Sequence, residues 1–156
     1  NDYAENISTD FTYNALSGMK MSPTALGWTG VGLASVDTGS DDPITINNTG
    51  NKINVNINVT SLDLQGEGIT DEYIFAENFT IENITAGCSG TFMVNATSIN
   101  VTSAILQRGN HSLNYNNATS GQEQIFFCLK GVPQDISPQS YSSEVLGAWT
   151  VEIITT

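Results

Sequence analysis

The residues of this chain best suited to chemistry are asparagines followed two positions later by serine or threonine. The Asn-X-Ser/Thr triplet is the acceptor of N-linked glycans. Nine such triplets occur in 156 residues, where chance placement of these residue types gives roughly 4. We therefore expect a glycosylated extracellular surface, although a Thr- and Asn-rich β protein without sugar would share this composition. The candidate glycosylation sites are Asn6, Asn47, Asn58, Asn78, Asn83, Asn95, Asn100, Asn110 and Asn117.

Cys88 and Cys128 are the two cysteines of the chain. An even cysteine count in an extracellular protein is typical of a disulfide, which we expect to join them. Closing a loop of this length stabilises a fold by about 4 kcal/mol in the chain-entropy model. A metal site or a catalytic thiol would need further partners, and His111 is the only histidine.

Two groups of acidic residues have the oxygen atoms that Ca²⁺ prefers. They comprise Asp37, Asp41 and Asp42 in one loop, and Asp63, Glu67, Asp71 and Glu72 further along. Neither group has the spacing of a helical calcium loop, so solvated turn acids are the simpler interpretation. The sequence also lacks the hydrolase, zinc and phosphate-loop motifs. We expect no enzymatic activity, no metal and no cofactor.

The composition indicates the compartment in which the protein is found. Charged residues make up 13% of it, against about 25% in an ordinary soluble domain. The formal net charge is −12, which repels nucleic acid and anionic membranes. No apolar run approaches the length of a membrane span. We therefore expect a processed protein, secreted or at the cell surface, with no nucleic-acid partner and no membrane span in the mature chain.

Apolar and polar residues alternate along most of the chain, which predicts an all-β fold. In residues 53–60, Ile53, Val55, Ile57 and Val59 share one face and the asparagines share the other. The residues just before this strand favour a turn, so we expect a hairpin with residues 44–46. Further strands are expected over residues 73–81, 90–95, 97–106, 111–115, 124–130 and 148–155.

Many short strands separated by turns are typical of one antiparallel β-sandwich, which we expect over residues 17–156. The spacing leaves a jelly-roll and an immunoglobulin-like topology open. The strand phases point Asn58, Asn78 and Asn100 outward, and Asn47, Asn110 and Asn117 fall in expected turns. Trp28 and Trp149 have apolar neighbours, so we expect core or interface anchors rather than ligand platforms.

Residues 1–16 form a candidate terminal strand. Tyr3, Ile7, Phe11 and Tyr13 fall on one parity of the alternation, and polar residues fall on the other. Such an arm could pair with its own sheet. It could instead complete the sheet of a neighbouring subunit, because a free sheet edge is a template for strand addition.

The strand, Asn-Thr-Gly-Asn, strand pattern of residues 43–55 resembles an element of secreted archaeal surface β-sandwich modules. It is also similar to the corresponding region of camelysin-type biofilm-fibre proteins, whose subunits join by donor-strand exchange. Archaeal extracellular thread and bundling-pilus subunits are similar in size, processed N-terminus and density of glycosylation triplets. The resemblance implies a subunit that polymerises with copies of itself.

Two functions are consistent with these observations. The first is a structural subunit of an extracellular glycosylated filament or surface lattice, assembled by β-strand addition between subunits. The second is a secreted binding module or adhesin that recognises carbohydrate or a cell surface. An exposed aromatic patch without sugar would favour the second.

Overall fold

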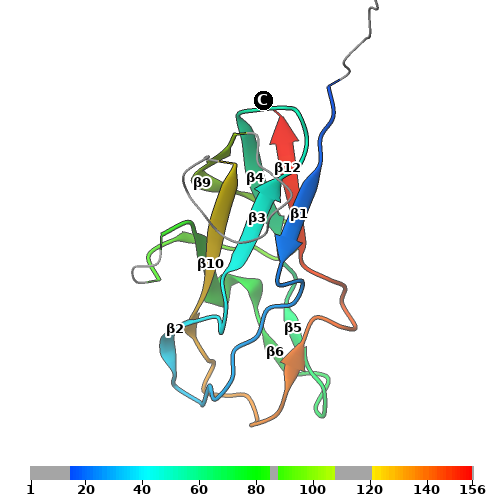
Figure 1. Cartoon of the computed structure of the whole chain (residues 1–156). Coiled ribbons are helices and arrows are strands. Elements are labelled where there is room, and N and C mark those ends of the chain that lie inside the picture. The colour runs from blue at the N-terminus through cyan, green and yellow to red at the C-terminus, as the bar shows by residue number, and fades with distance from the viewer. Residues whose placement is uncertain (1–14, 85–87, 108–120, 156) are drawn as a thin grey trace, which may run out of the picture.

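The computed structural model describes residues 15–84, 88–107 and 121–155, and β-strands predominate in them (Figure 1). The helical element of these ranges is a short 3₁₀ turn, η1 (Ala76–Asn78), and no helix in them is long and apolar enough to cross a membrane. The strands are β1 (Met19–Ser22), β2 (Val36–Gly39), β3 (Ile44–Asn48), β4 (Val55–Thr60), β5 (Leu64–Gly66), β6 (Tyr73–Ile74), β7 (Phe79–Glu82), β8 (Thr91–Phe92), β9 (Ser98–Leu106), β10 (Gln122–Gly131), β11 (Tyr141–Ser142) and β12 (Thr150–Thr155).

The strands form three antiparallel sheets. The largest has the order β1-β3-β10-β7-β8, with β2 also paired to β10. The second has the order β12-β4-β9, and the third has the order β11-β5-β6. The expectation of an all-β antiparallel fold is therefore confirmed. The strand pairing gives three sheets, so it does not establish the single sandwich that the sequence predicts.

Strand β10 holds the largest sheet together. Its first half pairs with β3, from Gln122 to Ile125. Its second half pairs with β7, and Cys128 and Leu129 also pair with β2. A strand this long meets different neighbours at its two ends, so it fixes the positions of segments that are far apart in the sequence.

The apolar core lies between the two larger sheets. Val55, Ile57 and Val59 of β4 are buried, as the alternation predicts, and they belong to one cluster with Ile125 and Phe127 of β10. Each fully buried side chain of this kind stabilises the fold by about 1.5–3 kcal/mol. The inward face of both sheets thus contributes to a single core.

The expected inward position of Ile53 is wrong, because this side chain is 57% exposed. The strand begins only at Val55. Asn54, which lies between them, has a left-handed backbone with φ of 57°. A left-handed residue interrupts the two-residue alternation, so the phase of β4 does not extend back to Ile53.

The expected hairpin between residues 44–46 and 53–60 is also wrong. β3 pairs with β1 and β10, while β4 pairs with β12 and β9. The buried Asn48 holds this crossover, since its Nδ2 donates to the carbonyl oxygens of Lys52 at 2.7 Å and Gln107 at 3.0 Å. Its Oδ1 accepts from the Gly50 amide at 3.0 Å. The asparagine-rich segment is therefore a link between two sheets.

The expected strand over residues 73–81 is divided by η1 into β6 and β7. The expected strand over residues 90–95 is shortened to β8. The strands expected over 97–106, 124–130 and 148–155 correspond to β9, β10 and β12. The one expected over 111–115, together with His111, lies outside the described residues.

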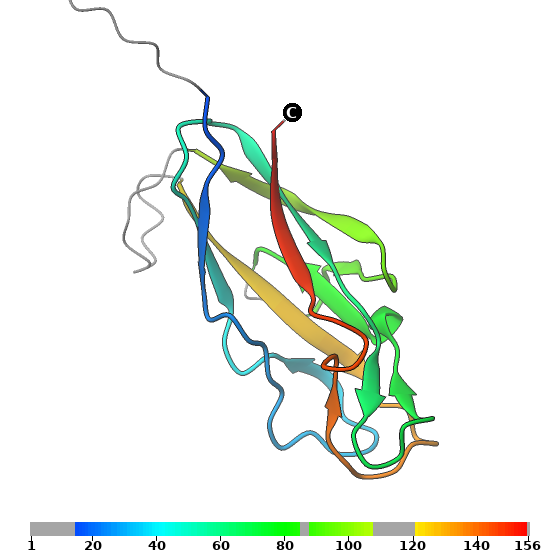
Figure 2. The same cartoon turned by 90° about the vertical axis from the view of Figure 1, so that its right-hand side faces the viewer.

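Strands β1 and β12 are edges of the two larger sheets and lie on the same side of the molecule (Figures 1 and 2). They run in opposite directions, and the end of β12 lies beside the start of β1 (Figure 2). Below these strands the chain continues as two segments, residues 24–33 after β1 and residues 136–149 before β12. These segments contain the walls of the candidate site.

Candidate functional site

An apolar groove of about 1080 Å³ opens between these two segments. Residues 24–33 form one wall, and residues 136–144 with Ala148 and Trp149 form the other. Met21 of β1 and Val151 of β12 lie where the groove meets the two edge strands. Its floor is the core itself, reached through the buried Ile44, Phe127 and Leu129.

Five aromatic residues line the groove, and four of their rings contact one another. Trp28 lies 5.0 Å from Phe79 and 6.3 Å from Trp149 between ring centroids. Trp149 in turn contacts Phe79 at 5.3 Å and Phe127 at 5.9 Å. Both indole N–H groups donate to backbone carbonyls, that of Trp149 to Leu62 at 2.8 Å. The structure confirms that both tryptophans pack against the core, and such ring contacts favour fixed orientations.

The wall of residues 136–144 is tied to the small sheet by the Glu72 carboxylate. This group accepts hydrogen bonds from the Ser137 amide at 2.7 Å, the Ser137 hydroxyl at 2.8 Å and the Tyr141 hydroxyl at 2.8 Å. The Gln139 side chain also donates to Glu72 at 2.9 Å, and its Oε1 accepts from the Gly68 and Ile69 amides. Because Ser137, Gln139 and Tyr141 line the groove, Glu72 positions that wall.

These hydrogen bonds change the acidity of the groups involved. The Ser137 backbone amide, followed by the Ser137 hydroxyl, lowers the pKa of Glu72, because each stabilises the ionised carboxylate. Burial, with the adjacent Glu72 carboxylate, raises the pKa of Tyr141. The wall is therefore held by a charged acceptor at neutral pH.

None of the glycosylation candidates within the described residues lines the groove. Asn58 and Asn100 are directly opposite each other on β4 and β9, and the Asn100 Nδ2 donates to the Asn58 Oδ1 at 2.9 Å. Asn95 and Asn100 are exposed, and Asn58, Asn78 and Asn83 are half-buried. Asn6, Asn110 and Asn117 lie outside the described residues.

Asn47 differs from the other candidates. The sequence predicts a turn there, but the residue lies in β3, is paired to Lys20 and Gln122, and is 0% exposed. A glycan on a fully buried amide has no path to solvent. The turn position is therefore wrong, and the folded structure has no room for sugar on Asn47.

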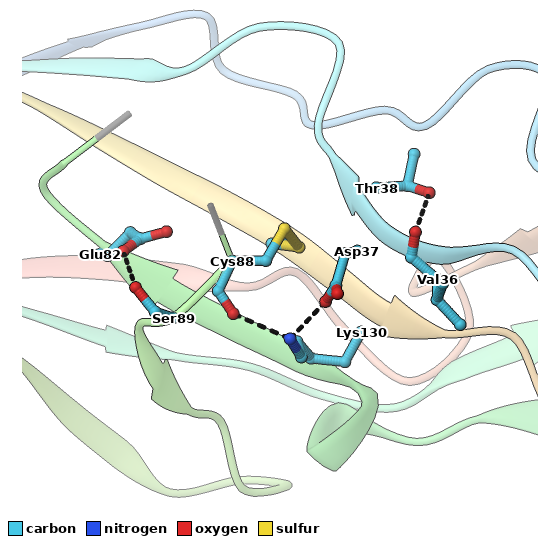
Figure 3. Close-up of polar contacts among 8 residues, drawn as sticks. Val36, Asp37, Thr38, Glu82, Cys88, Ser89 and Lys130 are labelled. Carbon is cyan, nitrogen blue, oxygen red and sulfur yellow. Dashed lines mark hydrogen bonds and ion pairs between the residues drawn. A yellow bond between two sulfur atoms is a disulfide. The ribbon is translucent and has the colours of Figure 1, made fainter. Parts of the chain in front are cut away.

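The predicted disulfide joins Cys88 to Cys128 of β10, with their Cα atoms 5.4 Å apart. Beside it, the Lys130 ammonium donates to the Cys88 carbonyl at 3.0 Å and forms an ion pair with Asp37 of β2 (Figure 3). This cluster fastens β2, β10 and the segment before β8 to one another. None of its residues lines the groove.

The two groups of loop acids do not converge on one point. Asp41 accepts from the Thr29 amide and hydroxyl, both at 3.1 Å, whereas Asp37 pairs with Lys130. Asp63 accepts from the Ala76 amide at 2.8 Å, whereas the Glu72 carboxylate accepts from Ser137, Gln139 and Tyr141. In the ranges that the structure covers, the one group of three metal-type ligands is Asp37 with the two cysteines, whose sulfurs are bonded to each other.

Residue type and alternation do not predict the groove. The distribution of glycosylation triplets along the chain is the one sequence signal that indicates it. No glycosylation triplet begins in residues 7–46 or in residues 118–156. These two stretches contain both groove walls. The arm residues Tyr3, Ile7, Phe11 and Tyr13 lie outside the described part of the chain.

Comparisons of the chain with protein-family models, with curated proteins and with solved structures found no match.

Proposed function

We propose that this protein is a structural subunit of an extracellular glycosylated filament or surface lattice, assembled from copies of itself by β-strand addition. In this proposal the two larger sheets act as the layers of one β-sandwich, because their inner faces share one core. The subunit has a mechanical role rather than a catalytic one. The resemblance to archaeal thread and bundling-pilus subunits implies the same role.

The single observation that carries the proposal is the position of the groove. It is apolar, it meets the edge strands β1 and β12 at Met21 and Val151, and its walls come from the two long stretches without glycosylation triplets. A contact surface between subunits must exclude bulky hydrated glycans, whereas the rest of a secreted filament gains solubility from them. Exposed apolar surface of this kind marks interaction sites in soluble proteins.

Strand addition agrees with the free edges of the sheets. Within the described residues β1 pairs with β3 alone, and β12 pairs with β4 alone. The outer side of each strand therefore presents backbone N–H and C=O groups without a strand partner, which a strand from another chain can satisfy. The main chain would supply affinity, and side-chain pockets would supply the register.

Electron microscopy of the full chain, isolated from its native source, tests this proposal. We expect long regular filaments or an ordered lattice. Dispersed particles at all concentrations, with no polymer after prolonged incubation, would contradict it.

A secreted binding module is the second candidate, and the aromatic rings in the groove favour it. Its test is different, because a binding module would stay monomeric and a soluble carbohydrate would change its tryptophan fluorescence. We favour assembly, because the groove meets the edge strands β1 and β12 at Met21 and Val151.

A further inference from the structure

We propose that the N-linked glycan of Asn78 packs on the exposed rings of Phe75 and Tyr73, with the first sugar against the face of Phe75. The triplet that carries this glycan is Asn78-Phe79-Thr80. The inference rests on the glycosylation that the proposed function includes, and it gives one glycan a structural role at a stated place. Tyr73, Phe75 and Asn78 do not line the groove.

Phe75 and Tyr73 form an aromatic pair at the surface. Phe75 is 52% exposed, and its ring lies nearly parallel to that of Tyr73, with an interplanar angle of 14° and 6.3 Å between centroids. Gln65 Nε2 donates to the Tyr73 hydroxyl at 3.1 Å and to the Thr70 carbonyl at 2.6 Å. These bonds hold Tyr73, which in turn orients Phe75. Apolar surface left in water is unfavourable, so a covering group stabilises the pair.

The 3₁₀ turn η1 places Asn78 on the same side of the chain as Phe75. The Asn78 amide donates to the Phe75 carbonyl at 2.9 Å, which closes the turn. Side chains three positions apart in a 3₁₀ turn eclipse each other. The burial agrees, because Ala76 and Phe79 are buried whereas Phe75 is exposed and Asn78 is half-buried. A sugar bonded to the Asn78 Nδ2 therefore begins beside the Phe75 ring.

The fold itself does not use the polar groups of this triplet. The Asn78 side chain makes no hydrogen bond with the described residues, whereas the Asn95 Nδ2 donates to Asp63 at 2.9 Å. Thr80 is 1% exposed, and its hydroxyl has no hydrogen-bond partner in the part of the chain that the structure describes. A buried hydroxyl without a partner is destabilising. The packing of β7 thus gives no reason for a threonine there, but a glycosylation triplet requires one.

Attachment of the glycan needs a sugar donor on a lipid-phosphate carrier. The bond between the sugar C1 and the carrier phosphate breaks, and the phosphate keeps the electron pair. C1 bonds to the Asn78 Nδ2, which loses its proton to a base of the transferring enzyme. Thr80 is buried opposite Cys128 in the folded chain. The enzyme must therefore bind the triplet before β7 pairs with β10.

The chemistry of a sugar ring fits the face of an aromatic ring. One face of a pyranose consists of C–H groups with small positive partial charges, and the face of an aromatic ring is negative. Packing the two faces together removes apolar area from water and leaves the sugar hydroxyls solvated. The glycan thus covers the aromatic pair, which then differs from the sugar-free patch that a binding module would present.

Phe92 and Asn95 are a matched control within the same chain. They have the same spacing, Phe92 is 56% exposed, and Asn95 begins a triplet. Their backbone differs, because Phe92 belongs to β8 and the turn that follows is closed from the Thr97 amide to the Val94 carbonyl at 3.0 Å. This turn begins after Phe92, so it does not place the ring beside Asn95. We expect no packing of an Asn95 glycan on Phe92.

Four full-length proteins from the native host measure the contact: the wild type, Phe75→Ala, Thr80→Val, and both changes together. Thr80→Val removes the triplet at the cost of an unpaired hydroxyl only, so it leaves the fold intact, and intact mass spectrometry should show the loss of one glycan. Urea unfolding is followed at concentrations where light scattering shows dispersed chains. We expect Phe75→Ala to raise the unfolding equilibrium constant roughly 2- to 12-fold more with the glycan than without it, the range of one aromatic contact.

Further variants separate ring packing from a general effect of the substitution. Phe75→Trp should keep the dependence on the glycan, because it retains an aromatic face. Phe92→Ala, made with and without Thr97→Ala, should change stability equally in both backgrounds. In NMR spectra, protons on one face of the first sugar should shift upfield in the wild type and not in Phe75→Ala, since only an aromatic ring supplies the ring current.

An equal effect of Phe75→Ala in both backgrounds would overturn the inference and leave filament assembly standing. An intact mass that shows no glycan on Asn78 would do the same. Equal coupling at Phe92 and Phe75 would overturn the role of the 3₁₀ turn. Absence of polymers in electron microscopy would contradict the proposed function and would not alter the measured contact.

Discussion

At the scale of single residues, a few buried or half-buried polar groups hold segments that the strand ladders do not connect. Asn48 links the two larger sheets through three hydrogen bonds. Glu72 holds the groove wall in place, because its carboxylate accepts four hydrogen bonds from three residues of that wall. Hydrogen bonds to a charged acceptor are about twice as strong as neutral ones, so the wall depends on the charge of Glu72.

Glu72→Gln should lower stability in a pH-dependent way. Because the folded-state pKa lies below the ordinary value of 4.5, the carboxylate contributes stability that is fully present above about pH 4.5 and is lost as the pH falls through the folded-state pKa. Urea unfolding at pH 7 should therefore separate the wild type from the variant, and at pH 3 the difference should shrink. Glu77→Gln, at an exposed acid of η1, is the control. An equal difference at both pH values would contradict the role of the charge.

At the scale of elements, the base of the arm packs closely on the crossover between β3 and β4. A Cβ added to Gly50 would lie 2.4 Å from the Leu16 carbonyl oxygen and 2.7 Å from the Gly18 amide nitrogen. Both neighbours are backbone atoms, which cannot rotate away. Glycine at this position therefore allows Leu16 and Gly18 to lie directly against the crossover.

Gly50→Ala should lower the free energy of unfolding by about 1–3 kcal/mol, as overpacking does. Gly39→Ala is the matched control, because a Cβ there meets nothing within 4 Å. Urea unfolding measures the difference. If the two variants behaved alike, the close contact at Gly50 would have no structural importance.

The disulfide also connects elements that are far apart in the sequence. It joins two residues 40 positions apart, and the Lys130 contacts beside it add β2 to the same unit. Closing such a loop is worth about 4 kcal/mol in the chain-entropy model. The segment before β8 is thus fixed covalently to β10.

At the scale of the whole molecule, expected sugar and expected contact surface are separated. The candidates Asn58, Asn95 and Asn100 lie on or beside β4 and β9, and the groove lies between residues 24–33 and residues 136–149. A filament built through the groove would leave the glycans on its outside.

Intact mass spectrometry of protein from its native host tests this distribution. Thr97→Ala removes the triplet of the exposed Asn95 and should lower the mass by one glycan. Thr49→Ala removes the triplet of the buried Asn47 and should change the mass only by the substitution itself. Loss of a glycan from Thr49→Ala would show that Asn47 is accessible to the modifying enzyme.

The local properties of the chain can be predicted from its sequence. The all-β character, the inward positions of Val55, Ile57 and Val59, the packing of the two tryptophans and the cysteine pair all follow from residue type and two-residue alternation. These signals depend on residues that are close in sequence and on the free energy gained when apolar side chains are removed from water.

Which strands pair, and which side chains they enclose, depends on the packing of the whole chain and is seen only in the tertiary structure. Alternation is the same whichever strand lies alongside, so the pattern of residues 44–60 fits a hairpin as well as the observed crossover. Asn47 is buried because β3 lies between β1 and β10, which its own triplet does not encode. The groove exists because residues 24–33 and 136–149 meet across the core, more than a hundred positions apart, and contacts at that separation are set by the packing of the whole chain.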